Sequence, residues 1–375
     1  KGSKVPKNRA MKFFSVKQQL YWWFFWGDSS LNSFGFFRGD HNSRMHTNEQ
    51  LPNFNPSGMV SSLPLGVIQA EGVDAASFLQ GQLTHDVLLL PVGQARLAGY
   101  CSAKGRLMAS FWVLKLSPEK FILVCHASLI AGILKRLSMF VMRAKVKLVD
   151  ASDAYRLTGL LGEGLLKAFP AAENQAPWKV LPLRESDNYL IQLYPAITNQ
   201  GAVPRALMIA KNFENMPVEL AQANLEALSQ ETWQLSEVLS GISMVQDLIS
   251  EAFVPQMLNY ESVDGVSFKK GCYPGQEVVA RSQFRGTLKR RAYVVSSQAP
   301  LSVGQEVFSS DDETQACGMV ANAASFSSDA SSPPASYWGI VSMQTSAAAQ
   351  SLHIGSGQGP ELNVHALPYA LLEDI

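Results

Sequence analysis

The sequence is poor in cysteine. Its 375 residues include four, Cys101, Cys125, Cys272 and Cys317, which are widely scattered and form no C-x-x-C pair. A zinc site or a self-contained four-cysteine iron–sulfur cluster is hard to build from such a set. Unpaired cysteines also suit a reducing compartment better than a secreted domain held by disulfides. We therefore expect four free thiols, no metal site and a cytoplasmic location.

An excess of charge of either sign is also missing. The chain has 31 basic and 31 acidic side chains, and its isoelectric point is near 7.2. Proteins that bind nucleic acid tightly usually carry a basic excess, because neutralisation of phosphates dominates their affinity. The composition therefore does not support tight, general binding of tRNA or DNA.

The first 58 residues differ from the rest of the chain and contain no long apolar run. A lysine-rich start is followed by Tyr21-Trp-Trp-Phe-Phe-Trp26 and then by a Gly/Ser/Asn-rich stretch. Six aromatic residues are too few for a signal peptide or for a spanning helix of about 20 apolar residues. One interpretation is a weak interfacial anchor. We favour the other, a disordered or non-native leader with Met45 as a possible start, and expect no membrane partner.

The chain as a whole has 47% hydrophobic and 17% charged residues, the composition of a folded protein, and its length predicts two or three domains. Between residues 63 and 150, apolar patterning predicts strands, a hairpin and helices. We expect strands at 66–70, 95–101, 107–116 and 121–125, and helices at 74–80, capped by Asp74, and 127–140. This mixture indicates an α+β fold rather than a doubly wound parallel sheet.

The second half of the chain continues this mixture and then changes character. We expect strands near 154–160 and 188–193, a helix at 218–228 and an amphipathic segment at 233–245. After Arg291, short β-type runs alternate with Ser, Gly, Pro and Asp, which indicates a small antiparallel barrel or sandwich. These runs are 292–295, 317–321, 337–343 and 362–366, with a mobile hairpin loop expected at 323–336.

The stretch with the clearest chemistry surrounds Cys272, between two lysines and a Pro-Gly turn. Cysteine reacts as thiolate, which nearby cations and the positive end of a helix favour. Lys269 and Lys270 supply cations, while Pro274-Gly275 fits the centre of a type II turn. Residues 276–281 can then form a helical turn. The pattern indicates an activated thiol; the alternative is a small buried residue beside a turn.

With its flanks, this motif resembles the signature of the YgfZ-type folate-binding proteins, relatives of the glycine-cleavage T-protein. The match rests on Lys270-Gly-Cys-Tyr-Pro-Gly-Gln-Glu277, preceded by Phe253-Val-Pro-Gln-Met-Leu-Asn-Tyr260 and followed by Val279-Ala-Arg-Ser-Gln-Phe-Arg-Gly286. Two upstream blocks are also similar, Phe78-Leu-Gln-Gly-Gln-Leu-Thr-His-Asp-Val87 and Ser102-Ala-Lys-Gly105. The resemblance covers about residues 62–375.

The resemblance implies a T-protein-like cloverleaf of two α+β domains and a C-terminal antiparallel β-barrel around a folate site. We expect a leader at 1–58, a discontinuous first domain at 59–149 plus 233–290 that binds folate, a second domain at 150–232 and the barrel at 291–375. It further implies tetrahydrofolate or a one-carbon derivative as ligand. The expected protein partners are iron–sulfur proteins such as tRNA-thiolating enzymes, with tRNA contacted indirectly by a monomer.

Within this resemblance Cys272 is the functional thiol and Lys270 its electrostatic partner. Trp233 occupies the place of a family tryptophan associated with folate, although it can equally be a core anchor. A second family tryptophan falls at Leu65, which departs from the pattern. The other expected folate-site residues are Tyr273, Gln276, Glu277, Asp86 and Gln82.

Alternative roles stay open for several of these residues. Tyr273 can pack rather than bind, and Glu277 can stabilise the helix start. Lys269 to Arg291 holds seven basic residues against one acid, a strip that suits a folate glutamate tail, a partner surface or solvent.

Two functions follow. The first is a folate-binding accessory factor that supports assembly or repair of iron–sulfur enzymes, and thereby tRNA thiolation, through Cys272. The second is a tetrahydrofolate-dependent aminomethyltransferase resembling the T-protein, against which the cysteine-centred signature speaks. A plain RNA-binding module is the weakest hypothesis.

Overall fold

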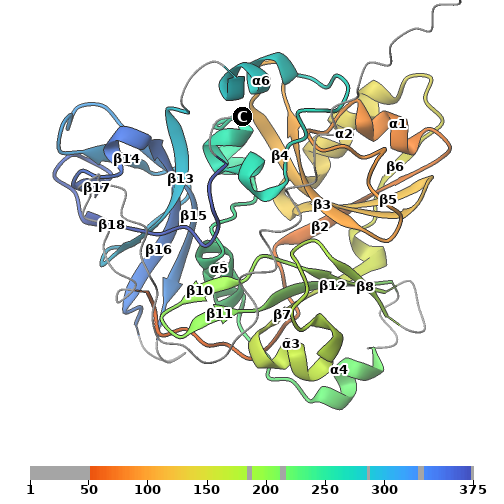
Figure 1. Ribbon diagram of the computed structural model, residues 1–375, viewed down its shortest axis with the longest axis horizontal. Helices are drawn as coiled ribbons and strands as arrows, with labels where there is room; N and C mark the ends of the chain where they lie inside the picture. Colours follow the sequence, from red (N-terminus) through yellow and green to blue (C-terminus); the bar gives the residue numbers. More distant parts are fainter. Residues whose placement is uncertain (1–50, 184–187, 212–216, 285–287, 328–332, 373–375) are drawn as a thin grey trace, which may run out of the picture. The chain divides into compact units, whose positions relative to one another are not determined.

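The computed structural model describes residues 51–183, 188–211, 217–284, 288–327 and 333–372. The chain divides into two compact units, Lys1–Ser43 and Arg44–Ile375, and all described residues belong to the second. They form two five-stranded antiparallel sheets, a two-stranded hairpin and a closed six-stranded barrel (Figure 1). No helix in these ranges is long and apolar enough to cross a membrane.

The first sheet has the order β3-β4-β5-β2-β6 and carries two helices. Its strands are β2 (Leu65–Glu71), β3 (Ala95–Cys101), β4 (Leu107–Ser117), β5 (Lys120–His126) and β6 (Lys147–Asp150). Helix α1 (Ala75–Gln80) contacts β5, and α2 (Ile130–Val141) contacts β2 and β6. Gly66 permits the close crossing of α2, since a Cβ there would lie 2.7 Å from Cγ1 of Ile130.

The second sheet has the order β1-β7-β12-β9-β8. Its strands are β1 (Gly58–Val60), β7 (Tyr155–Leu161), β8 (Val180–Pro182), β9 (Tyr189–Gln192) and β12 (Arg205–Lys211). Helices α3 (Gly162–Ala168) and α4 (Val218–Ala223) belong to this part, and β10 (Ala196–Thr198) pairs with β11 (Gly201–Val203). The sheet therefore combines a strand from before residue 61 with strands from after residue 154.

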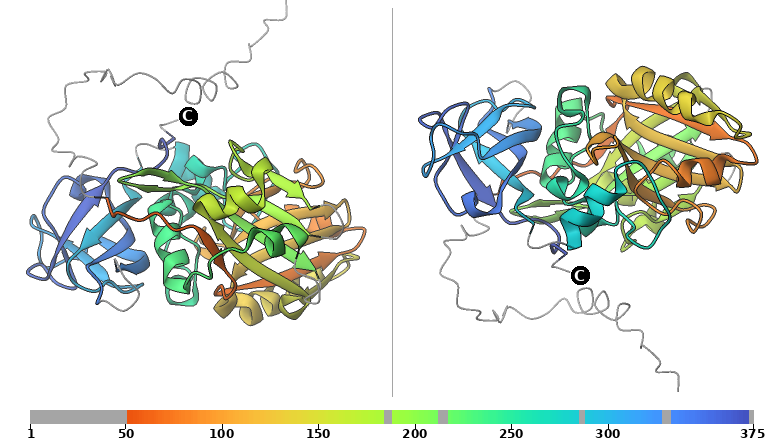
Figure 2. Two further views of the ribbon diagram at one scale, coloured as in Figure 1. Left: turned by 90° about the horizontal axis from the view of Figure 1, so that it is seen from below. Right: turned by 90° about the horizontal axis from the view of Figure 1, so that it is seen from above.

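The closed barrel follows the order β13-β16-β15-β14-β17-β18, coloured blue in Figures 1 and 2. Its strands are β13 (Arg290–Ser297), β14 (Glu306–Ser309), β15 (Gly318–Phe326), β16 (Ser336–Gln344), β17 (Leu352–Ile354) and β18 (Glu361–His365). Two further helices, α5 (Gln230–Leu239) and α6 (Gln276–Phe284), precede it in the chain. Closure pairs every strand edge, which removes the open edges that promote aggregation.

Asn259 links the barrel to the segment that precedes the signature motif. Its backbone is left-handed, at φ 58°. Its Nδ2 donates to the Ala292 carbonyl over 2.9 Å, and its Oδ1 accepts from the Ala292 amide over 3.2 Å. Asparagine suits such a position because it tolerates this conformation and carries both a donor and an acceptor.

The fold class expected from the sequence is confirmed: an α+β chain that ends in an antiparallel barrel. Three local expectations were wrong. The helix expected at 218–228 ends at Ala223, because Asn224 turns left-handed at φ 44°. The segment expected at 233–245 is helical only as α5, which ends before the left-handed Gly241. The loop expected at 323–336 is shorter, since β15 runs to Phe326 and β16 starts at Ser336.

Two further details before residue 75 differ from what the sequence predicted. Asp74 precedes α1, but its carboxylate accepts the Lys145 amide over 2.7 Å instead of capping the helix. Residues 51–58 were expected to belong to the leader, yet Phe54 is buried and Gly58 pairs with Leu161 of β7. The domain bounds drawn from the sequence otherwise stay predictions, as does everything expected of residues 1–50, which lie outside the described ranges.

Candidate functional site

The signature loop, residues 267–275, joins the 3₁₀ helix Tyr260–Val263 to α6. Gly275 has φ 77°, the value that a type II turn demands at its third position, so the expected Pro-Gly turn is present. The Gly275 carbonyl accepts the Val279 amide over 3.1 Å, which starts α6. Inside this helix, Arg281 lies 3.4 Å from the carboxylate of Glu277, one turn earlier.

Backbone hydrogen bonds attach the loop to the block that begins at Phe78. The Ser267 amide donates to the Thr84 carbonyl over 2.9 Å. The buried hydroxyl of Thr84 donates to the Gly265 carbonyl over 2.6 Å and accepts the Gly99 amide over 2.7 Å. One threonine therefore holds the entry to the signature loop against strand β3.

Lys270 secures the middle of the loop. Its ammonium donates to the Gln80 carbonyl over 2.5 Å and to the Leu83 carbonyl, and lies 4.8 Å from the ring centroid of Tyr273. Burial lowers the pKa of Lys270 to about 8, although the charges of Asp86 and Cys272 act in the opposite direction. The lysine thus clamps the loop onto the 80–83 turn and stays within electrostatic reach of the thiol.

The structure distinguishes Cys272 from the other cysteines. All four lie in the described ranges; Cys272 is exposed, and Cys101, Cys125 and Cys317 are buried. Burial raises the pKa of Cys101 and of Cys125 to about 12, which makes both inert as thiolates at neutral pH. Cys272 is consequently the cysteine that a reagent or partner can reach from solvent.

The remaining residues expected in the motif have different surroundings. Tyr273 is buried, and burial together with nearby Cys101 raises its pKa. The side-chain amide of Gln276 donates to the Lys270 carbonyl over 3.5 Å, and so braces the loop. Glu277 is exposed in the first turn of α6. Packing and bracing therefore account for Tyr273 and Gln276 in this structure.

The two residues expected from the upstream block lie beside the lysine clamp. Asp86 accepts the Leu89 amide over 2.9 Å and is close enough to Lys270 to raise its pKa. Gln82 falls between the two residues whose carbonyls bind Lys270, and its Oε1 is buried without a hydrogen-bond partner among the described residues. The structure thus brings Lys270, Cys272, Tyr273, Asp86 and Gln82 into one region.

Trp233 is enclosed by core residues and not by the residues of the signature loop. It lies on α5 with no exposed surface, and the Arg205 guanidinium is 4.8 Å from its ring centroid. A Cβ added to Gly159 would lie 2.4 Å from its Cε3 atom, so β7 presses directly against the indole. This environment matches the core-anchor interpretation, and a role in stacking on folate stays a prediction.

A cluster of charged and aromatic residues around His85 was not expected from the sequence. Burial and nearby Arg96 lower the pKa of His85 to about 4, against the opposing effects of Asp264 and Asp86. The Nδ1 atom of His85 is buried and has no hydrogen-bond partner in the described ranges. His85 could have been found, because it lies in the Phe78 block, whereas Arg96 and Asp264 carry no local signal.

Aromatic residues extend this cluster. Tyr194 lies near Asp264 and Arg96, which shift its pKa in opposite directions while burial raises it. Its ring makes edge contacts with Trp178 and with Tyr369, at 6.0 Å between centroids in both cases. Tyr369 lies 175 positions after Tyr194, so only folding brings it to the other two rings. We call His85, Arg96, Asp264 and Tyr194 the His85 cluster.

No group of three or more His, Cys, Asp or Glu side chains in the described part of the chain is arranged to hold a metal ion. At the signature loop, the structure places an exposed thiol within electrostatic reach of a buried ammonium. The His85 cluster offers hydrogen-bonding, charged and aromatic groups instead, a set that suits a polar heteroaromatic ligand.

Comparisons with known proteins identify the fold and the family of the chain. Residues 36–169 match the GCVT N-terminal domain family. Among solved structures, the glycine cleavage system aminomethyltransferase T of Bartonella henselae superposes with a TM-score of 0.61 over 84% of this chain and 87% of its own, at 14% identity. The fold is thus that of the aminomethyltransferase T proteins.

Sequence relatives define the family further. The tRNA-modifying protein YgfZ of Colwellia psychrerythraea is 30% identical over 270 residues, which cover 71% of this chain and 79% of the relative. Its counterpart in Photobacterium profundum is 32% identical over 62% of this chain and 68% of the relative. The protein of the same name in Photorhabdus laumondii is 27% identical over 85% and 94%, respectively. The chain belongs to the YgfZ family.

Proposed function

We propose that this protein is a folate-binding accessory factor that supports assembly or repair of iron–sulfur enzymes in the cytoplasm, and thereby tRNA thiolation. The observation that carries the proposal is the single exposed thiol, Cys272, held on a loop that Lys270 and Thr84 fasten to the 80–84 turn. The names of its relatives, tRNA-modifying proteins, support the same role.

The loop fits a partner-directed thiol better than a self-contained catalytic centre. Its anchoring bonds leave Cys272 facing solvent while the backbone around it is held by buried groups. A fixed backbone lowers the entropy lost when a partner engages the thiol. We propose that Cys272 acts on iron–sulfur proteins such as tRNA-thiolating enzymes, and that tRNA is affected indirectly by a monomeric factor.

The His85 cluster fits the chemistry of folate. Its buried Nδ1, which has no partner in the described ranges, can hydrogen-bond a heterocycle, and Tyr194 provides an aromatic surface. The Arg96 guanidinium suits a carboxylate of the glutamate tail, and the Asp264 carboxylate suits ring N–H donors. Bound tetrahydrofolate or a one-carbon derivative would supply a one-carbon carrier; the residues of the chain bind and orient it.

Cys272→Ala tests the accessory role. The variant would replace the family member in bacterial cells, and thiolated nucleosides would be measured in bulk tRNA together with activity of the thiolating iron–sulfur enzyme. We expect both to fall toward the level of cells lacking the protein, whereas Lys269→Ala, which alters an exposed neighbour, retains them. Unchanged thiolation with Cys272→Ala would refute the role of the thiol.

Folate binding is tested separately on the purified chain. Tetrahydrofolate should quench tryptophan fluorescence, and Arg96→Gln should weaken binding of polyglutamylated more than of monoglutamylated folate. Trp233→Phe distinguishes the two interpretations of Trp233, because loss of binding with an intact fold would assign it to the folate site. If the chain binds no folate, the folate part of the proposal is refuted. The test of Cys272 is independent of that result.

The aminomethyltransferase alternative predicts a product. Incubation of the chain with tetrahydrofolate and an aminomethyl donor would then yield methylenetetrahydrofolate. We expect none above background, because the signature centres on a cysteine. Turnover that survives Cys272→Ala would favour the transferase over the accessory factor.

A further inference from the structure

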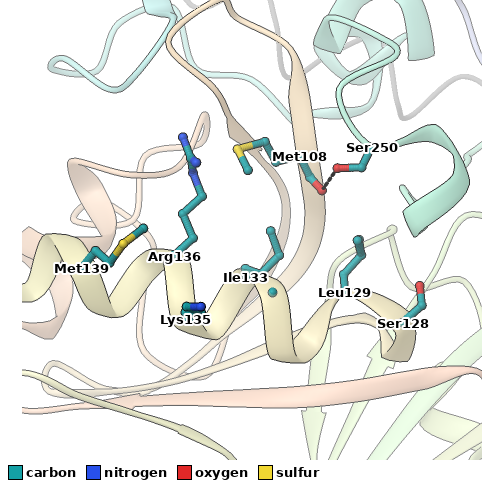
Figure 3. A pocket seen from close by; sticks show the side chains of 9 residues that line it. Met108, Ser128, Leu129, Ile133, Lys135, Arg136, Met139 and Ser250 are labelled. Atoms are coloured by element: carbon teal, nitrogen blue, oxygen red, sulfur yellow. Dashed lines mark hydrogen bonds between the residues drawn. The ribbon is translucent and has the colours of Figure 1, made fainter.

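Helix α2 borders a groove that lies outside both the signature loop and the His85 cluster. The groove has a volume of about 320 Å³. Ile133 of α2 and Leu129, in the 3₁₀ turn just before α2, face Met108 of β4 across it. Ser250, which donates to the Met108 carbonyl over 3.0 Å, closes the far side (Figure 3). On the helix side, a Cβ on Gly132 would meet nothing within 4 Å, so the groove is open there. This space admits a few side chains of a partner but not a folded element.

Exposed apolar side chains also occur in the chain segments that line the groove. Met139 is 61% exposed, Phe140 44% and Met142 87%, while Leu248, two residues before Ser250, is 69% exposed. Apolar side chains gathered on a surface mark binding sites, and methionine adapts its shape to different partners. The groove and its surroundings therefore have the composition of a peptide-binding surface.

The charge along this segment is entirely positive. From residue 127 to 149 the chain carries five basic residues and no acid, although the whole chain has equal numbers of each. Lys135 and Arg136 line the groove itself, and Arg143, Lys145 and Lys147 follow α2. The acid at the opposite end is Asp247, whose amide donates to Ser128 over 3.4 Å. The groove is thus basic where Lys135 and Arg136 line it, and the backbone of Asp247 lies beside Ser128 at the other end.

We propose that the α2 groove, lined by Met108, Leu129, Ile133, Lys135, Arg136 and Met139, binds an acidic amphipathic segment of a partner protein. Apolar side chains of the segment would enter between α2 and β4, and its carboxylates would pair with the basic side chains at the Met139 end. RNA fits less well because phosphates gain nothing from the apolar floor. A lipid surface fits less well because the apolar side chains of the floor are recessed.

Selection from a random library of 12-residue peptides on the full chain tests the chemistry of the partner. The counter-selection uses Lys135→Glu/Met139→Glu, which changes two rim residues. We expect peptides that combine Asp or Glu with Leu, Ile, Phe or Met. Enrichment of basic peptides, or of the same peptides on the rim variant, would overturn the proposal.

Binding of one selected peptide is then measured by fluorescence anisotropy. We expect at least a tenfold loss of affinity with Lys135→Glu/Met139→Glu. The matched control is Lys179→Glu/Val218→Glu, which makes the same kind of change at exposed positions of the second sheet region and should bind as the unaltered chain does. Equal weakening by both variants would refute a specific groove.

The same two variants test whether the groove binds lipid or RNA instead of a peptide. Phosphatidylglycerol vesicles and bulk tRNA replace the peptide as probes. The proposal would be overturned in favour of a lipid or RNA surface by one result. In it, the chain binds vesicles or tRNA more tightly than any selected peptide, and the rim variant, but not the control variant, loses that binding. The proposal does not rest on the role of Cys272, so Cys272→Ala should leave peptide affinity unchanged.

Discussion

Gly275 lies so close to Gly105 that a Cβ on Gly275 would be 2.5 Å from the Gly105 amide nitrogen. The two glycines bring the signature loop against the turn between β3 and β4, and a Cβ on Gly275 would also lie 2.4 Å from the Ser102 carbonyl oxygen. The motif and the Ser102–Gly105 block, which both resemble the family's sequence, are therefore in contact in the folded chain.

The first prediction concerns this contact. Gly275→Ala should lower the free energy of unfolding by at least about 2 kcal/mol, because φ is 77° and the added methyl group meets backbone atoms. Gly271→Ala is the matched control, since a Cβ there meets nothing within 4 Å. Denaturant unfolding would measure both, and equal stabilities would contradict the prediction.

The second prediction concerns the lysine clamp. Lys270→Met should cost about 2 kcal/mol, because the Gln80 and Leu83 carbonyls lose a buried donor. Amide hydrogen exchange should accelerate around residues 267–279, where the loop is released. Lys269→Met, at an exposed neighbour, should change stability by less than about 0.5 kcal/mol. Equal stability and equal amide exchange in the two variants would show that the lysine does not hold the loop.

The third prediction concerns cysteine accessibility. Iodoacetamide should label the folded chain once, at Cys272, since the other three thiols are buried. In guanidinium chloride all four should react. Mass spectrometry of the intact protein and of its peptides measures both states. Labelling of Cys101 at a comparable rate in the folded protein would show that the region behind Tyr273 opens readily.

The fourth prediction concerns pH. The pKa of His85 is about 4 in the folded chain and 6.5 unfolded, so between these values the unfolded chain binds a proton that the folded chain does not. Acidification therefore favours unfolding, and the contribution of His85 should fall by about 2 kcal/mol from pH 7 to pH 5. His85→Gln should lose correspondingly less stability over this range. A parallel decline in both proteins would place the acid sensitivity elsewhere.

Much of the fold could be predicted because its signals are local. Apolar alternation placed β2, β3, β4 and β5 within one or two residues, and the Pro-Gly pair marked the turn before α6. The errors occurred where a single backbone conformation ends a helix: Asn224 and Gly241 stop α4 and follow α5 through positive φ angles. Asparagine and glycine can adopt positive φ angles but also occur inside helices, so their presence alone does not mark the end of a helix.

The signature cysteine illustrates the division between sequence and tertiary structure. The sequence by itself singled out Cys272 as the candidate functional thiol, because the charges, the turn residues and the helix start around it are all encoded within fifteen positions. Only the tertiary structure decided that Lys270 donates its hydrogen bonds to the Gln80 and Leu83 carbonyls. It likewise decided that Trp233 packs between Gly159 and Arg205, and that His85 lies beside Asp264. These contacts join residues 28 to 190 positions apart, and such pairings depend on how the elements pack, which no local pattern records.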